Sequence, residues 1–482
     1  MSTLKLAFWD LSGRIITNSS TLITSIILTR LLSPSEFGAF SIVLAVIVLS
    51  SVFIDFGFRP SIVQRKEITQ KQLSTIFFLT LFSSILLFTS ASLLGIFLED
   101  FYGIDSLGKY LSVSSMSFIL SALSIVPSSL LHRNLQFKRI SLVNSISALI
   151  SATVAILLAY ADFRIWSLVF QNLTLNGISL IGFYASTKWL PSISLEISSV
   201  KELWNYGSKI FLAGLLETAH TRLDVFIIGR VFPLETLGYY NRAQHFDYFI
   251  KTFFASTITS VSFPLISKTE EEMAKTLYRR YLNYICLVSF CLVGITFITC
   301  YDIILIVFGE RWLPSGEFFR IMSITGFVYP VSALMVTIIS ARGNSLAFLK
   351  LDVIKKCFLS LTYLAFFAKD IKIYLISLGV AYIIALIANI HFVKKEISIS
   401  FKEQCLVLSK YFLTAFFSTL ITFFLTSPLN VPVYHLLASS VVFVCFYVSI
   451  GYLLKLESLI EMKERLQKVY ENIRYKNIFT EH

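Results

Sequence analysis

Charged residues are scarce in this chain. Asp, Glu, Lys and Arg together make up 15% of its 482 residues, whereas apolar residues make up 56%. Water-soluble globular domains do not reach this balance, so the composition predicts a polytopic membrane protein. Gly and Pro are also few, at 19 and 10 residues. Their scarcity excludes the collagenous and low-complexity classes.

Cysteine and histidine number six each, and neither residue type forms a motif. The cysteines fall inside or beside apolar stretches, without the spacing of metal ligands or of a disulfide framework. The chain has no HExxH motif, no nucleotide-binding GxxxxGK[ST] motif and no soluble segment long enough for an ATPase. We therefore expect no enzyme activity, no metal and no cofactor. The net charge is +12, but without a basic soluble domain it does not indicate a nucleic-acid partner.

Long apolar stretches recur along the whole chain, each about long enough to cross 30 Å of hydrocarbon. They predict an all-α polytopic membrane protein with about fourteen transmembrane helices. The predicted spans are 11–32, 37–54, 73–98, 110–131, 140–161, 165–187, 203–229, 237–267, 281–301, 321–341, 351–368, 373–390 and two in 411–454, divided at Pro428 and Pro432.

The connecting segments carry their Lys and Arg residues unevenly. Even-numbered connections together with both termini hold 25 of them, whereas odd-numbered connections hold six. Because cytoplasmic segments retain positive charge, this alternation predicts that both termini are cytoplasmic. We predict no cleavable signal peptide, since residues 1–10 lack an apolar core. Residues 455–482 form a charged amphipathic tail, expected on the membrane surface or in the cytoplasm.

A segment near the N-terminus recurs about 200 residues later without gaps. Residues 27–40 align with residues 227–240, and Arg30 and Gly38 are matched by Arg and Gly at positions 230 and 238. Six spans separate the copies, so the two halves have the same orientation and are related by an axis along the membrane normal. The substrate path is expected in a central cleft between them.

The repeat divides the chain into four predicted parts. They are an N-terminal six-helix lobe at 1–200, a C-terminal six-helix lobe at 201–400, two additional transmembrane helices in 401–454 and the tail at 455–482.

Five stretches carry a resemblance to a known family: Ile26–Gly38, Asp55–Phe58 with Gln64, Arg133–Lys138, Trp166–Val169 and Asp224–Ala243. Over nearly its whole length the chain resembles the Wzx-type polysaccharide repeat-unit flippases of the multidrug/oligosaccharidyl-lipid/polysaccharide exporter superfamily. The resemblance implies two pseudo-symmetric six-helix lobes and two extra helices. It also implies export of an undecaprenyl-diphosphate-linked sugar unit across a bacterial inner membrane.

Ionisable side chains inside a membrane span are costly, at least about 2.5–3.5 kcal/mol each, so each is a candidate functional residue. Four such residues of the span 203–229 lie within an arc of about 80° on the helix: Lys209, Glu217, His220 and Asp224. Asn205 lies beside this arc, and Arg222 lies on another face. The alternative is that Glu217, His220 and Asp224 form a structural hydrogen-bond cluster that fixes this helix to a neighbour.

Two further spans contribute candidates. Arg14 and Asn18 share a polar stripe in the span 11–32. Arg242 and Asp247 lie in the first half of the span 237–267, where Asp247 also has the i,i+4 spacing that allows a pair with Lys251.

A lipid-linked diphosphate needs countercharge and hydrogen bonds to cross the apolar core. The residues expected to bind the substrate are Arg14, Lys209, Arg222 and Arg242 at the diphosphate, and Asn18 and Asn205 at the sugars. The residues expected to couple transport to H⁺ or Na⁺ are Glu217, His220, Asp224 and Asp247. The expected partners are the lipid-linked oligosaccharide, the coupling ion, membrane lipid and a polysaccharide polymerase.

Three alternative functions compete with this interpretation. A drug or cation antiporter of the same superfamily is expected to favour acidic residues in its cavity, and a peptidoglycan precursor flippase is also cationic inside. An integral-membrane glycosyltransferase needs catalytic carboxylates on long extracytoplasmic loops, whereas the odd-numbered connections here are short.

Overall fold

The computed structural model describes residues 3–65, 67–193, 196–267, 269–465 and 467–468. It describes only the backbone at 3–7, 197–206, 209–210, 249–250, 345 and eight positions between 253 and 264. The chain divides by packing into two compact units, Met1–Asn241 and Arg242–His482. The predicted lobes were defined by the internal repeat, whereas these units are defined by packing. The division into lobes therefore stays a prediction.

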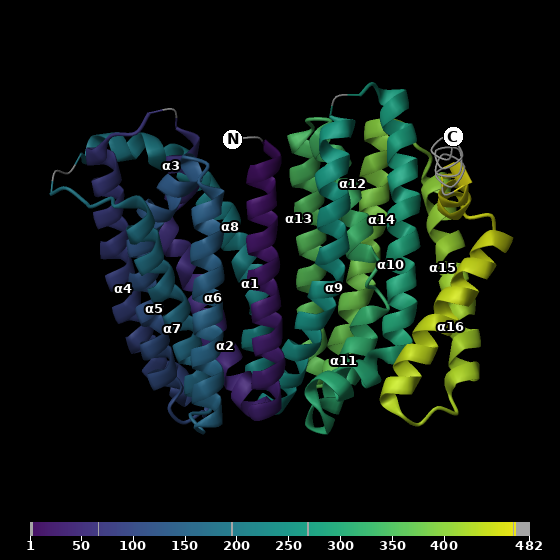
Figure 1. The fold of residues 1–482 in the computed structure, drawn as a ribbon, viewed down its shortest axis with the longest axis horizontal. Coiled ribbons are helices and arrows are strands. Elements are labelled where there is room, and N and C mark those ends of the chain that lie inside the picture. Colours follow the sequence, from purple (N-terminus) through teal and green to yellow (C-terminus); the bar gives the residue numbers. More distant parts are fainter. Residues whose placement is uncertain (1–2, 66, 194–195, 268, 466, 469–482) are drawn as a thin grey trace, which may run out of the picture. The chain divides into compact units, whose positions relative to one another are not determined.

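The first unit is built of long helices that run back and forth beside one another (Figure 1). Their bounds are α1 (Thr3–Leu31), α2 (Pro34–Asp55), α3 (Phe58–Gln64), α4 (Gln70–Tyr102), α5 (Leu107–Arg133), α6 (Phe137–Tyr160), α7 (Ile165–Thr187) and α8 (Ile197–Val231). Helix α9 (Leu234–Ile266) begins in this unit and continues into the second.

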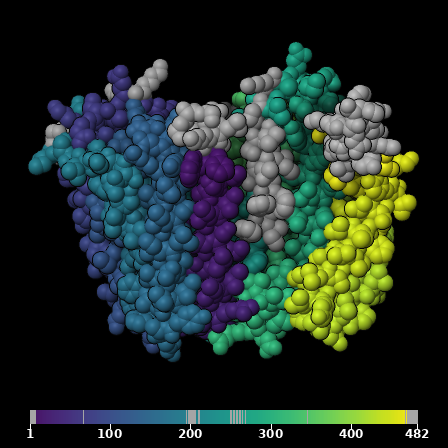
Figure 2. Space-filling view, in the orientation of Figure 1, coloured from purple at the N-terminus to yellow at the C-terminus, as the bar shows by residue number. Residues whose placement is uncertain are grey.

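Among its described residues, the second unit also consists of helices joined by turns and short loops. Its elements are α10 (Glu271–Phe308), η1 (Glu310–Trp312), α11 (Leu313–Ser323), α12 (Val328–Ala341), α13 (Ser345–Leu361), η2 (Thr362–Ala368), α14 (Ile371–Ile397), α15 (Phe401–Thr426) and α16 (Pro432–Leu453). Figure 2 shows α15 and α16, coloured yellow-green to yellow, as one flank of this unit.

Each of the fourteen predicted spans falls on helical elements. The span 321–341 covers the broken pair α11 and α12, which bends by 41°, and the span 351–368 covers the end of α13 and η2. Among the described residues, nine helices are long and apolar enough to cross a membrane, or ten if the broken pair forms one span. The predicted all-α polytopic membrane fold is confirmed, and fourteen crossings are compatible with these helices. Helices α1, α8 and α9 are not among the nine, and these three carry every candidate site residue.

Local sequence signals explain where several helices begin. Ser33 caps α2, because its side-chain oxygen accepts from the Glu36 backbone N–H at 3.3 Å while the Glu36 carboxylate accepts from the Ser33 N–H at 2.7 Å. Thr69 and Gln72 form the same reciprocal capping box at the start of α4. Each box satisfies two backbone donors that a helix leaves free at its N-terminus.

Small residues let the helices of the first unit approach closely. An ideal Cβ on Gly95 of α4 would lie 2.9 Å from the Cα of Gly108 on α5, a distance that real side chains do not tolerate. Several serines of α5, among them Ser115 and Ser129, are fully buried. Close packing of Gly and Ser replaces the hydrophobic effect as the source of helix association in lipid.

The core of the second unit joins α10, α12, α14, α15 and α16. Tyr278, Tyr411 and Tyr447 are all at most 2% exposed within it. Each of their hydroxyls donates a hydrogen bond, for example from Tyr447 to the Leu287 carbonyl at 3.0 Å and from Tyr278 to the Gln404 side chain at 2.8 Å. These bonds satisfy phenol groups that would be costly to bury unpaired.

The first part of the tail packs against this core. Residues 457–465 are helical, and Leu456 and Leu459 are 1% and 3% exposed. Glu457 binds Arg279 of α10, and Glu461 binds the neighbouring Arg280. This segment is therefore attached to the second unit at the α10 end opposite Phe308.

Candidate functional site

The two copies of the internal repeat meet each other. An ideal Cβ on Gly38 of α2 would lie 2.1 Å from the Leu234 carbonyl oxygen of α9, and one on Gly238 would lie 2.0 Å from the Pro34 carbonyl oxygen. The two contacts are equivalent under the repeat, because Gly38 corresponds to Gly238 and Pro34 corresponds to Leu234, each 200 residues apart. A contact of this reciprocal kind requires a local two-fold axis between the glycines, which supports the predicted relation between the repeats.

Helix α2 also contacts α8 along its length. Ile42 packs against Gly229, with a Cβ on that glycine falling 3.0 Å from the Ile42 Cδ1. At the other end of α2, a Cβ on Gly57 would lie 2.4 Å from the Gly207 carbonyl oxygen. The φ angle of Gly57 is +74°, a conformation that side chains rarely adopt. The repeat helices α2, α8 and the start of α9 therefore form a tightly packed group within the first unit.

Helix α1 exposes its polar stripe. Arg14 is 71% exposed at its side chain, and its Nε lies 2.9 Å from the Asp10 carboxylate, which is 41% exposed. Asn18, one turn further along, is exposed as well. An exposed ion pair of this kind is worth at most about 1 kcal/mol, so a stronger anion can displace Asp10 from the Arg14 guanidinium.

The ionisable stripe of α8 changes environment along the helix. Glu217 is exposed, His220 is half-buried and Asp224 is 6% exposed. The Tyr240 hydroxyl donates to one oxygen of Asp224, and the Val225 backbone N–H donates to the other at 2.8 Å. Asp224 thus joins α8 to the start of α9. Both its predicted role in ion coupling and the alternative of a structural cluster with Glu217 and His220 stay predictions.

Three further candidates on α8 are Arg222, Asn205 and Lys209. Arg222 is half-buried, and its Nε has no hydrogen-bond partner among the described residues. The side chains of Asn205 and Lys209 lie outside the described part of the chain. A buried guanidinium N–H without a partner is costly, so Arg222 remains a candidate donor for an anionic ligand.

The two candidates of α9 belong to the second unit. Arg242 is partly buried at its start. Asp247 pairs with Lys251 at 2.5 Å between the carboxylate and Nζ, and the side chains are 13% and 11% exposed. The ten predicted site residues are therefore distributed over both units, and polar contacts have been described for Arg14, Asp224 and Asp247.

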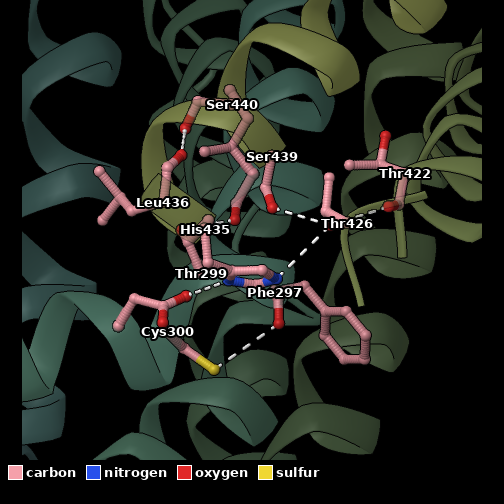
Figure 3. Close-up of polar contacts among 11 residues, drawn as sticks. Phe297, Thr299, Cys300, Thr422, Thr426, His435, Leu436, Ser439 and Ser440 are labelled. Carbon is pink, nitrogen blue, oxygen red and sulfur yellow. Dashed lines mark hydrogen bonds and ion pairs between the residues drawn. The ribbon is translucent and has the colours of Figure 1, made fainter. Parts of the chain in front are cut away.

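One polar pair in the second unit was not predicted from the sequence. The Nδ1 of His435 on α16 lies 2.6 Å from the Asp302 carboxylate on α10. Figure 3 shows His435 also reaching toward Thr426, at 3.4 Å from Nε2 to Oγ1, while Ser439 donates to the same Thr426 oxygen at 2.9 Å. This cluster ties the end of the α15–α16 hairpin to α10.

Comparison with known proteins identifies the family. A family model described as polysaccharide biosynthesis protein matches residues 27–317. The teichuronic acid biosynthesis protein TuaB of Bacillus subtilis is 23% identical over 62% of this chain and 62% of its own length. The lipopolysaccharide biosynthesis protein WzxC of Escherichia coli is 21% identical, over 73% of each chain. The matched region of this chain thus spans between three fifths and three quarters of these relatives.

A solved structure shares the fold over nearly the whole chain. The lipid II flippase MurJ in an inward closed conformation superposes with a TM-score of 0.75 at 14% sequence identity, covering 94% of this chain and 98% of that chain. This likeness establishes the arrangement of the helices. Because the family model covers more than half of the chain, the chain belongs to the polysaccharide biosynthesis protein family, within the multidrug/oligosaccharidyl-lipid/polysaccharide exporter superfamily that its residues resemble.

Proposed function

We propose that this chain is a flippase that moves undecaprenyl-diphosphate-linked oligosaccharide repeat units from the cytoplasmic to the periplasmic leaflet. Transport is coupled to an ion gradient by alternating access, and both termini are cytoplasmic. The family match and the relatives named for teichuronic acid and lipopolysaccharide biosynthesis support a polysaccharide precursor as substrate. They favour this function over a drug antiporter or a peptidoglycan precursor flippase.

The observation that carries the proposal is the exposure of Arg14 and Asn18 one turn apart on α1, a helix that the sequence predicts to be a membrane span. Lipid acyl chains do not accept an exposed guanidinium, so this part of α1 faces water, another part of the protein or a polar ligand. A diphosphate offers the Arg14 guanidinium a bidentate contact stronger than the one with Asp10. Arg222 offers a second N–H donor from α8.

The experiment is substitution of Arg14 in cells that depend on this export. A charge-assisted hydrogen bond contributes about 1.5–3 kcal/mol, so Arg14→Ala should lower transport by roughly 10- to 100-fold. Surface polysaccharide should be lost while the protein remains in the membrane. Arg139→Ala is the matched control, because Arg139 is an exposed arginine of the same unit that binds the Ser186 carbonyl at 2.7 Å. Normal polysaccharide with Arg14→Ala would refute the assignment.

Asp10→Asn gives the opposite test at the same place. It removes the carboxylate that competes for Arg14 and should leave transport equal to wild type or faster. The sequence also predicts a loss of transport with Lys209→Ala. A polysaccharide polymerase as partner and H⁺ or Na⁺ as coupling ion complete the proposal.

A further inference from the structure

The middle of α9 holds an acid–base pair away from bulk water. Asp247 and Lys251 lie one turn apart, 2.5 Å from carboxylate to Nζ, and each side chain is nearly nine-tenths buried. The Lys251 Nζ also lies 5.8 Å from the centre of the Tyr382 ring on α14. The ring face adds an attraction for the ammonium. Burying two charges in this way is costly unless the geometry is good, so the pair requires an explanation.

The pair lines a small pocket within the second unit. The other pocket residues come from α10, α11, α12 and the turn between the last two: Ser289, Leu292, Val293, Thr296, Phe319, Ser323, Gly326 and Pro330. The Ser289 side chain is 3% exposed, and its oxygen has no hydrogen-bond partner among the described residues. The pocket has room for about one water molecule. A buried, unpartnered hydroxyl beside an ion pair indicates a site for a small polar guest.

The pocket adjoins the break between α11 and α12. The chain bends there by 41°, and an ideal Cβ on Gly326 would lie 3.7 Å from the Lys251 Cε and 2.9 Å from the Ser323 carbonyl oxygen. Broken helices at membrane depth occur where backbone lines a cavity or an ion site. The ion pair thus touches the one bent helix pair found in the described part of the chain.

We propose that this pocket is a proton-exchange site, in which the Asp247 carboxylate takes up H⁺ and Lys251 is a fixed internal counter-cation. The inference rests on the proposed function and names its coupling ion. A proton from water binds one Asp247 oxygen and forms the neutral acid. The net charge of the pair rises from zero to plus one. The Lys251 ammonium then retains its contact with the Tyr382 ring and donates a hydrogen bond to the Ser289 oxygen. Release of the proton restores the ion pair.

The pocket favours H⁺ over Na⁺. Hard metal cations take about six oxygen ligands, whereas the space holds about one water molecule. An ammonium already contacts the carboxylate, so a metal ion there would stand beside a second cation at close range. Among the described residues that line the pocket, Asp247 and Lys251 are the only ionisable side chains. The residues of α10, α11 and α12 that line it are neutral, and α14 places the Tyr382 ring near Lys251.

Protonation of Asp247 weakens its contact with Lys251 next to the break between α11 and α12. The carboxylate loses its charge, so Lys251 is held less firmly near Gly326 and Ser323. The bend between α11 and α12 is then free to change. Proton uptake is thereby linked to a movement of the second unit, as a gradient-coupled carrier requires.

The first test is infrared spectroscopy of the purified full chain during a pH titration. In the wild type, the carbonyl band of a protonated buried carboxyl group should appear on acidification, and Asp247→Asn should remove it. Asp352→Asn is the matched control, because Asp352 and Lys356 of α13 have the same i,i+4 pairing at 2.9 Å but are 37% and 29% exposed. Loss of the band in the control, or its persistence in Asp247→Asn, would overturn the proposal.

Lys251→Met tests the counter-cation. A buried carboxyl group without its cation is stable as the neutral acid, so the band should be present throughout the titration. A band that still titrates as in the wild type would show that Lys251 has no such role.

Transport by proteoliposomes separates this proposal from the proposed function. An imposed proton gradient should accelerate wild-type and Asp352→Asn transport several-fold, and should leave Asp247→Asn at its rate without a gradient. Full acceleration of Asp247→Asn would refute the proton site. Absence of any wild-type transport, with the Asp247 infrared band present, would instead refute the flippase function.

Discussion

The crossing of α2 and α9 should be intolerant of any side chain at its two glycines. Gly38→Ala would place a Cβ 2.1 Å from the Leu234 carbonyl oxygen, and Gly238→Ala would place one 2.0 Å from the Pro34 carbonyl oxygen. Ordinary contact begins near 3.4 Å, so each change demands more than about 1 Å of separation. The atoms in the way belong to the backbone of a helix, which cannot move aside as a side chain does.

The expected cost follows from overpacking. Inserting a methyl group into a packed core costs about 1–3 kcal/mol and occasionally more, and the replacement of Gly by Ala within a helix returns at most about 1 kcal/mol. Because backbone atoms block the methyl group here, the upper end of that range applies, and each single variant should be destabilised by roughly 2 kcal/mol after that gain is subtracted. Since the two contacts are reciprocal, the two variants should cost about the same. The double variant should cost less than the sum, because one separation of the helices relieves both clashes.

The assay is thermal unfolding of the purified protein in detergent. Gly177→Ala is the matched control, since Gly177 lies inside α7 and nothing lies within 4 Å of an ideal Cβ there. Its unfolding temperature should equal or exceed that of the wild type. Unfolding of Gly38→Ala and Gly238→Ala at the wild-type temperature would refute the close crossing and the local two-fold axis inferred from it.

Four further changes test contacts elsewhere in the chain. Tyr240→Phe removes the hydroxyl that donates to the buried Asp224 and should cost about 1.5–3 kcal/mol in unfolding free energy, measured by denaturant titration. His435→Gln breaks the contact with Asp302 and should raise amide exchange in α16, as measured by hydrogen–deuterium exchange. Unchanged exchange there would contradict the attachment to α10. Leu459→Ala should cost about 2–5 kcal/mol because this side chain is 3% exposed, whereas Glu457→Gln should cost about 1 kcal/mol or less because its pair with Arg279 is half-exposed. Protease cleavage of the tail distinguishes the two.

The membrane helices are predictable from the sequence for a simple physical reason. A helix needs about 18 consecutive apolar residues to cross the hydrocarbon core, and the charged residues that flank such a run mark its ends in the sequence. The repeat could also be detected in the sequence, because residues 27–40 and 227–240 align without gaps and place Gly38 opposite Gly238. The structure gives a physical reason for the equivalence of the two glycines. Gly38 of α2 packs against the backbone of α9, Gly238 of α9 packs against the backbone of α2, and neither position has room for a Cβ.

Contacts between distant residues were not predictable from a single sequence. Asp302 lies at the border of an uncharged run, and His435 counts as uncharged within another, yet the two pair across 133 positions. The break between α11 and α12 contains no proline, and Gly326 alone is a weak signal. The tail had an amphipathic pattern, but the pattern did not tell a membrane surface from the core that buries Leu459.

The roles predicted for the candidate site residues stay predictions, but the structure shows surroundings that the sequence alone did not reveal. Glu217 and Asp224 share one face of α8, and yet the first is exposed and the second is bound to Tyr240. Tyr240 of α9 binds Asp224, whereas Glu217 lies about two turns nearer the N-terminus of α8. A helical-wheel argument contains no information about such a neighbour.

The most direct test of the central claim is the transport of a lipid-linked oligosaccharide by the purified chain. Proteoliposomes would contain an undecaprenyl-diphosphate-linked repeat unit, and its appearance in the opposite leaflet would be followed with a glycosidase or lectin added outside. The wild type should move the lipid much faster than protein-free vesicles, and Arg14→Ala should lose roughly 10- to 100-fold of that rate. A wild-type rate equal to that of empty vesicles would contradict the function proposed for this protein.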